Sequence, residues 1–99
     1  MCGALPGEAS RPLDEIGTQS VIEGVVSRDG ELLPGAYVRL LDSTGEFTAE
    51  VQTDDAGRFR FHTRAGDWVL RTLAPGAATT DTAAAVGAGE VLPVEVMLD

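Results

Sequence analysis

Hydrophobic and polar residues alternate with a period of two along most of the chain from residue 21 onward. This period is typical of β-strands that bury one face and expose the other. The alternation predicts six strands, at residues 21–27, 36–41, 46–52, 58–62, 68–72 and 92–98. Because Pro93 lacks a backbone donor, the last strand is expected to lie at a sheet edge or to begin near this residue.

Turn sequences rich in glycine and proline separate the predicted strands, about every 8–12 residues, as in β-sandwich domains. The strands at 46–52 and 58–62 flank residues 54–57 and are expected to form a hairpin with a loop of about four or five residues. Residues 74–90 are predicted to form a loop, although residues 79–85 would add a seventh strand if they pair. The expected fold class is all-β, a small antiparallel β-sandwich of six to seven strands.

Four of the five aromatic side chains fall in the phase expected to face the core: Phe47, Phe59, Phe61 and Trp68. Each can bury about 150–250 Å², so together they are expected to dominate the energy of the core. Gly57 and Gly66 occupy connections that need a left-handed backbone, which glycine adopts at little cost.

The first 20 residues contain Pro6, Pro12, three glycines and scattered charges, without sustained periodicity. Such a composition buries too little apolar surface to offset ordering, so residues 1–20 are expected to form a flexible N-terminal arm. Residues 21–99 then form the single domain for which 99 residues suffice. The chain has neither an apolar stretch of about 20 residues nor a basic and apolar signal sequence, so we expect a cytoplasmic protein without membrane contact.

The composition argues against some classes of binding partner and of metal site. Seven arginines, no lysine and 16 acidic residues give a net charge of −9, which argues against nucleic-acid binding. A single cysteine forms no internal disulfide, and with one histidine it cannot supply a four-ligand zinc site. We therefore expect no metal and no cofactor.

Several motifs in order resemble the carboxypeptidase regulatory-like domain, which has a transthyretin-like (prealbumin-like) sandwich. They lie at residues 24–30, 34–40, 53–61 and 65–70, within a resemblance that covers about residues 21–73. This resemblance implies the fold, and it carries no information about chemistry because the module occurs in many contexts.

A second resemblance extends over nearly the whole chain except residues 5–19 and 74–90. Met1-Cys2-Gly3-Ala4, the runs at 38–43 and 46–51, Gly57, Phe59-Arg60-Phe61 and residues 68–71 resemble the small actinobacterial SseC family. That family is linked to sulfur metabolism beside thiosulfate sulfurtransferases (rhodaneses). The resemblance implies a non-enzymatic accessory protein with such a partner, and the alternative is a protein–protein interaction module without sulfur chemistry.

Cys2 is the leading candidate for chemistry. If the initiator methionine is removed, Cys2 carries a thiol and a free α-amine, and an adjacent ammonium lowers the pKa of a thiol. Such a group could accept a sulfane sulfur as a persulfide, or chelate a soft metal when a partner completes the site. The alternative is an incidental thiol in the arm.

Four arginines and the single histidine share the outward phase: Arg39, Arg58, Arg60, Arg71 and His62. If their strands are neighbours, the forked guanidinium groups could form a stripe that binds an oxyanion such as thiosulfate or sulfate. The alternative is pairing with carboxylates on adjacent strands, for which Glu23, Glu46 and Glu50 are available.

Other catalytic and metal-binding patterns fit poorly. The chain has no Gly-x-Ser-x-Gly motif to accompany His62, and it lacks the C-terminal Tyr-Arg-Gly-Ser of transthyretin-like hydroxyisourate hydrolases. Asp54, Asp55 and Gly57 do not have the spacing of a calcium loop and are explained by a turn. No catalytic residue is therefore predicted within the domain.

Overall fold

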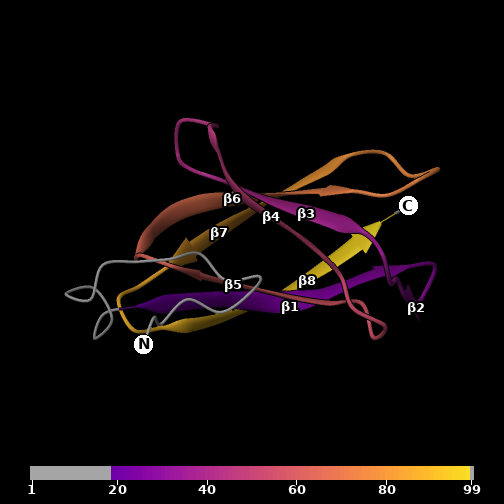
Figure 1. Cartoon of the computed structure of the whole chain (residues 1–99), viewed down its shortest axis with the longest axis horizontal. Coiled ribbons are helices and arrows are strands. Elements are labelled where there is room, and N and C mark those ends of the chain that lie inside the picture. The colour runs from indigo at the N-terminus through magenta and orange to yellow at the C-terminus, as the bar shows by residue number, and fades with distance from the viewer. Residues whose placement is uncertain (1–18, 99) are drawn as a thin grey trace, which may run out of the picture.

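The structure is a computed structural model that describes residues 19–98, and these residues form strands and no helix (Figure 1). Among them, accordingly, no helix has the length and apolar character needed to cross a membrane. The strands are β1 (Ser20–Arg28), β2 (Glu31–Leu32), β3 (Tyr37–Leu41), β4 (Phe47–Gln52), β5 (Arg58–Thr63), β6 (Gly66–Leu73), β7 (Thr80–Val86) and β8 (Val91–Leu98).

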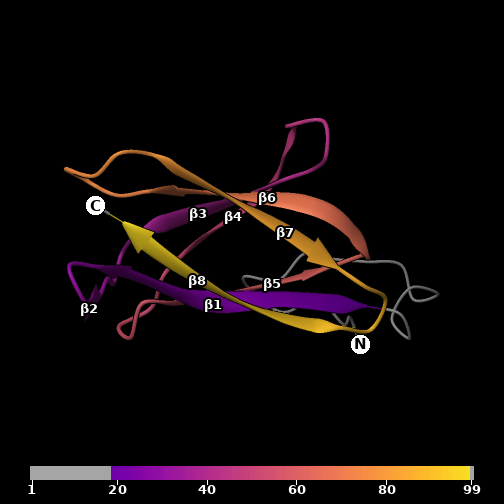
Figure 2. The ribbon, with the colours of Figure 1, turned by 180° about the vertical axis from the view of Figure 1, so that it is seen from behind.

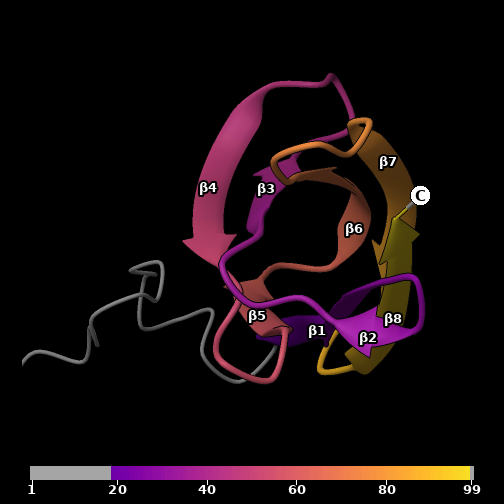
Figure 3. The same cartoon turned by 90° about the vertical axis from the view of Figure 1, so that its right-hand side faces the viewer.

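Two sheets pack against each other, as the alternation predicts for a β-sandwich. One sheet has β1 at its centre, with β5 and the short β2 on one side and β8 on the other. The second sheet has the order β4-β3-β6-β7. Figure 3, which looks along the molecule, shows the two sheets enclosing one interior, with β7 and β8 adjacent at one side.

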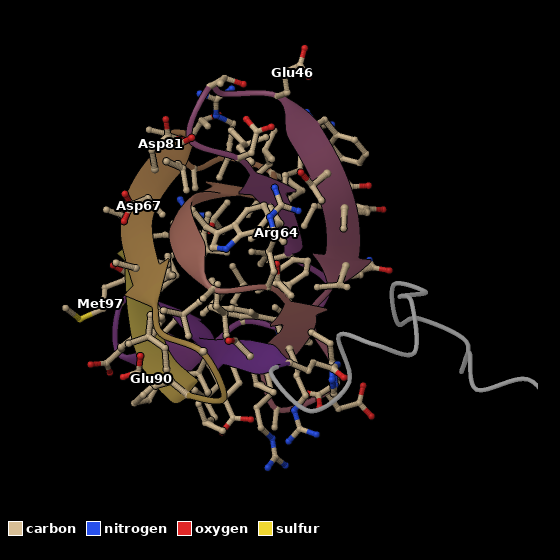
Figure 4. All side chains as sticks on the ribbon, turned by 90° about the vertical axis from the view of Figure 1, so that its left-hand side faces the viewer. Glu46, Arg64, Asp67, Asp81, Glu90 and Met97 are labelled. Carbon is tan, nitrogen blue, oxygen red and sulfur yellow. The ribbon has the colours of Figure 1, made fainter. Side chains whose placement is uncertain are left out.

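The core lies between the sheets and is built from the inward phase of the strands. Phe59, Phe61 and Trp68 are all buried there, as predicted, beside aliphatic residues from both sheets. The one polar atom of the indole is satisfied, because Trp68 Nε1 donates to the Arg64 carbonyl at 3.1 Å. The guanidinium carbon of Arg64, which Figure 4 labels, lies over the Trp68 ring, 5.2 Å from its centre.

The last strand departs from the antiparallel expectation, because β8 runs parallel to β1 along its whole length. The chain turns from β7 in one sheet into β8 in the other (Figure 2), and the Val21 N–H donates to the Glu90 carbonyl at 2.9 Å where β8 begins. Pro93 is near the start of β8, which lies at the edge of its sheet, as predicted.

Gly24 permits the close approach of these two strands. A Cβ at this position would lie 1.9 Å from the Val94 carbonyl oxygen, so no larger residue fits unless the β8 backbone moves. Gly24 is thus a packing requirement of the parallel β1–β8 pair.

The predicted hairpin between residues 46–52 and 58–62 is wrong, because β4 and β5 belong to different sheets. The connection crosses between them and is fixed by buried Thr53, whose hydroxyl accepts from the Ala36 N–H at 2.9 Å and donates to the Leu33 carbonyl at 2.7 Å. Gly57 has φ +74°, as predicted for this turn, and a Cβ there would meet the Val26 carbonyl at 2.8 Å.

The inward placement of Phe47 is also wrong, since its side chain is 62% exposed. Phe47 opens the edge strand β4 opposite Leu41, at a register shift between Leu40 and Leu41. The register shift breaks the alternation between Phe47 and Ala49, so Phe47 does not share the inward face on which Ala49 and Val51 pack against the core.

Two segment boundaries also change. The predicted loop at 74–90 contains a full strand, β7, which pairs with β6, so the alternative of a strand within residues 79–85 is the correct one. Ser20, assigned to the arm by the sequence pattern, is the buried first residue of β1. The remainder of the predicted arm, residues 1–18 with Cys2, lies outside the described residues.

Candidate functional site

The described chain begins against the edge strand β5. Gln19 Nε2 donates to His62 Nδ1 at 2.6 Å, and the Ser20 hydroxyl donates to the Gly87 carbonyl at 2.6 Å. These contacts fix where the segment that carries Cys2 joins the domain, at the end of the strand that also bears Arg58 and Arg60.

The four candidate arginines lie on two different faces. Arg39 and Arg71 project from β3 and β6 in one sheet, whereas Arg58 and Arg60 project from β5 in the other. The condition for a single stripe, that these strands be neighbours, is therefore not met. Arg39 lies against Glu50 and Arg60 against Glu23, which are among the carboxylates named in the alternative of cross-strand pairing.

A row of four charges crosses the outer face of the β4-β3-β6-β7 sheet. Arg39 stands opposite both Glu50 and Arg71, and Arg71 stands opposite Asp81. Arg39 Nε lies 2.7 Å from Glu50 Oε2, and Arg71 binds Asp81 with Nε at 2.9 Å and Nη2 at 3.0 Å. Two neighbouring like charges are thus each held by an outer carboxylate, which reduces their mutual repulsion.

The ion pair between Arg71 and Asp81 shifts the pKa values of both side chains. Hydrogen bonds from Arg71 lower the pKa of the Asp81 carboxyl, and the carboxylate in turn raises the pKa of the Arg71 guanidinium. Both side chains are nearly half exposed, so an anion that approaches Arg71 must compete with Asp81 and with water.

Arg58 and Arg60 border a surface hollow of about 530 Å³. In the described part of the chain its lining comes from four strands and one turn: Glu23, Gly24, Val25, Val51, Gln52, Asp54, Arg58, Phe59, Arg60 and Pro93. Arg60 Nε lies 3.1 Å from Glu23 Oε1, and Arg58 Nε lies 3.9 Å from Asp54 Oδ2. The lining of the hollow thus contains two guanidinium groups and two carboxylates.

Asp54 plays the turn role that the sequence predicts. Its Oδ1 accepts from the backbone N–H groups of Arg58 and Ala56, both at 2.9 Å, and these bonds lower the pKa of the carboxyl. Asp42 acts in the same way at the β3–β4 turn, where bonds from Thr44 and the Glu46 N–H lower its pKa. Within residues 19–98 no cluster of His, Asp or Glu side chains has a geometry that holds a metal.

Exposed apolar side chains are the surface feature that the sequence interpretation missed. Leu32 and Met97 flank Ser27 on the outer face of the β1 sheet, and Met97 is 71% exposed and points away from the domain (Figure 4). The outward phase of Met97 in the last predicted strand was the available signal, since alternation with Val96 and Leu98 places it there.

Comparison with known sequences identifies the family. Residues 2–98 match a family described as "Protein of unknown function (DUF1416)". The chain belongs to the DUF1416 family.

DUF1416 relatives occur in mycobacteria. Uncharacterised proteins Rv0814c and Rv3118 of Mycobacterium tuberculosis are each 54% identical over 56 residues, and the match spans 56% of this chain and 56% of theirs. A Mycolicibacterium smegmatis protein is 44% identical over 72 residues, which is 72% of this chain and 80% of that one. These names assign no activity, so the link of this DUF1416 chain to SseC proteins and sulfur metabolism stays a prediction.

Solved structures similar to the DUF1416 chain establish the fold alone. The minor pilin GBS52 of Streptococcus agalactiae matches with a TM-score of 0.69 and 18% identity, over 84% of this chain and 45% of the pilin. A dioxygenase domain from Streptomyces sp. SirexAA-E matches with a TM-score of 0.71 and 14% identity, over 97% of this chain and 92% of that one. At such identities the dioxygenase activity does not carry over.

Proposed function

We propose that this chain is a non-enzymatic accessory protein that works with a thiosulfate sulfurtransferase and accepts a sulfane sulfur on Cys2. The observation that carries the proposal is the placement of the chain's entry: Gln19 is held against His62 of β5, so the segment with Cys2 starts beside the strand that bears Arg58 and Arg60. An extended chain spans about 3.3–3.6 Å per residue, so the residues between Cys2 and Gln19 are long enough to reach the hollow at Arg58 and Arg60.

The transfer step uses groups that this chain and a rhodanese possess. The Cys2 thiolate attacks the outer sulfur of the rhodanese persulfide, so that a new S–S bond forms at Cys2 while the rhodanese S–S bond breaks. The rhodanese cysteine leaves as a thiolate, and thiosulfate recharges it with release of sulfite. Guanidinium groups at the hollow would favour the anionic forms of thiosulfate and of the Cys2 persulfide.

The test is intact-mass spectrometry after incubation with thiosulfate and a rhodanese. We expect an increase of about 32 Da, one sulfur atom, that is removed by a reductant and absent in Cys2→Ser. Omission of the rhodanese should abolish the increase. An unmodified mass with an active rhodanese present would overturn the acceptor role.

The exposed apolar pair Leu32 and Met97 favours a second candidate, an interaction module without sulfur chemistry. Affinity capture separates the two functions. If Cys2→Ser retains every partner and complements loss of the protein in cells, the interaction module is the correct function. If Cys2→Ser binds its partners but fails to complement, the sulfur acceptor is favoured.

A further inference from the structure

We propose that the outer face of the β4-β3-β6-β7 sheet is a docking surface for a protein segment that presents apolar side chains between basic ones. The centre of this surface is an apolar row that crosses the four strands and consists of Phe47, Leu41, Val69 and Ala83. The inference concerns a partner protein and does not depend on the sulfur chemistry proposed for Cys2.

The register shift between β3 and β4 brings Phe47 into this row. Leu40 stands opposite Ala49, whereas the next residue, Leu41, stands opposite Phe47, so Thr48 is the extra residue of a β-bulge. Ala49 packs against the core, but Phe47, beyond the bulge, lies on the outer face beside Leu41 and is 62% exposed. A bulge typically re-aims a side chain, and here it directs an aromatic ring into solvent.

Leu41 shows that the row is an apolar cluster outside the core. It shares the outer face with Arg39, because alternate residues of a strand lie on one face. Leu41 is only 5% exposed, yet it does not belong to the core cluster of the described residues. Its cross-strand neighbours are Phe47 and Val69. The described chain has no third layer over this face (Figure 3), and exposed apolar surface of this kind marks interaction sites.

Apolar surface continues on the other side of the neighbouring row of charges. Arg39 and Arg71 in that row are each neutralised by a carboxylate of an adjacent strand. Beyond them Tyr37, which is 44% exposed, stands opposite Leu73 on the same face. Phenylalanine, tyrosine and arginine are enriched where proteins bind one another, so the composition of this face fits a protein partner.

Negative charge at the border of the row determines the charge of the partner. Glu46 directly precedes Phe47, and Asp67 lies two residues before Val69 on the same face of β6. Among residues 19–98 no basic side chain forms an ion pair with Glu46 or Asp67. Figure 4 shows both carboxylates pointing away from the domain, whereas Arg64 lies over the opening between the sheets. Positive charge on the partner is therefore complementary to this face.

The length of the row matches two turns of a helix. Neighbouring strands lie about 4.8 Å apart, so the row spans about 14 Å from β4 to β7. Apolar side chains at positions i, i+4 and i+7 of a helix span about 10–11 Å. An amphipathic helix can thus cover the row with its apolar stripe and place its basic residues near Glu46 and Asp67.

Binding of a designed peptide to the full chain tests the surface. The probe is a helix of about 18 residues with leucine along one face and lysine on the other. It should shift the amide NMR signals of the four residues of the row. Phe47→Ala should raise its dissociation constant at least about tenfold. Met97→Ala, which alters a comparably exposed apolar side chain on the other sheet, is the matched control and should leave the constant unchanged, as should Cys2→Ser.

Two further arms separate the apolar contact from the charge. A lysine–alanine helix of equal charge should bind at least about tenfold more weakly than the lysine–leucine helix. The double variant Glu46→Gln, Asp67→Asn should weaken binding and reduce its dependence on NaCl. Unshifted signals in the row, parental affinity in Phe47→Ala, equal weakening by Met97→Ala, equal affinity of the two peptides, or a double variant that binds like the parent would each overturn the proposal.

Discussion

A single methyl group added at Gly24 tests how closely β8 lies on β1. Its Cβ would stand 1.9 Å from the Val94 carbonyl oxygen, 2.8 Å from the Val94 carbonyl carbon and 3.0 Å from Phe59 Cζ. A carbon and a carbonyl oxygen normally approach to only about 3.3 Å, so the overlap is about 1.4 Å. The two nearest of these atoms belong to the Val94 backbone, so no side-chain rotation relieves the overlap.

The expected cost follows from that geometry. Extra methyl groups in a packed interior cost about 1–3 kcal/mol when side chains can adjust. Here β8 must move, which loosens the packing of Val96 and Leu98 against the core, so Gly24→Ala should lower the free energy of unfolding by about 3 kcal/mol or more. Domains of this size have a total stability of only about 5–10 kcal/mol, so the effect is a large fraction of it.

Urea unfolding followed by fluorescence of the single tryptophan, Trp68, measures this change. Gly87→Ala is the control, because its Cβ would meet only the flexible Glu90 carboxylate at 3.2 Å, and it should cost less than about 1 kcal/mol. A Gly24→Ala variant within about 0.5 kcal/mol of the parent would refute the close parallel pairing of β1 and β8.

Three further predictions concern the core, a buried hydroxyl and acid stability. Urea unfolding should show that Phe61→Ala costs about 3–5 kcal/mol, whereas Phe47→Ala costs less than about 1 kcal/mol because the Phe47 side chain is exposed. Thr72 Oγ1 is buried without a hydrogen-bond partner among the described residues, so Thr72→Val should raise the melting temperature, with a gain of about 1 kcal/mol. Because Arg71 lowers the folded-state pKa of Asp81 below 3.8, the stability from this pair is present above that value and is lost as the pH falls further. Urea titrations between about pH 5 and pH 2 should therefore show a shallower acid loss in Asp81→Asn, and equal slopes in the two proteins would contradict the pairing.

The sequence predicts which side chains of a strand are buried wherever the alternation of apolar and polar residues is unbroken. Phe59, Phe61 and Trp68 alternate with polar residues in strands whose pairing has no register shift, so their phase alone identifies the core. Phe47 alternates with polar residues in the same way, but a register shift separates it from Ala49 in β4, and no local pattern in the sequence reveals that shift.

Which strands pair with one another could not be predicted from the sequence, because the pairing depends on contacts between residues that are distant in the chain. The link between β4 and β5 resembles a hairpin turn, yet the hydrogen bonds of Thr53 to Leu33 and Ala36 send the chain into the other sheet. Whether the arginines of the outward phase lie on one face depends on the same kind of distant contact. Their common phase was correct, but Arg39 and Arg71 share a sheet that does not contain Arg58 and Arg60.

Mass spectrometry of the protein isolated from its own cells, without reduction, tests the proposed sulfur-acceptor function most directly. In cells supplied with thiosulfate, the peptide that contains Cys2 should carry about 32 Da of additional mass that a thiol reductant removes. The modified fraction should fall when the partner sulfurtransferase is deleted. A Cys2 peptide found only as the unmodified thiol, at all levels of thiosulfate, would contradict the account.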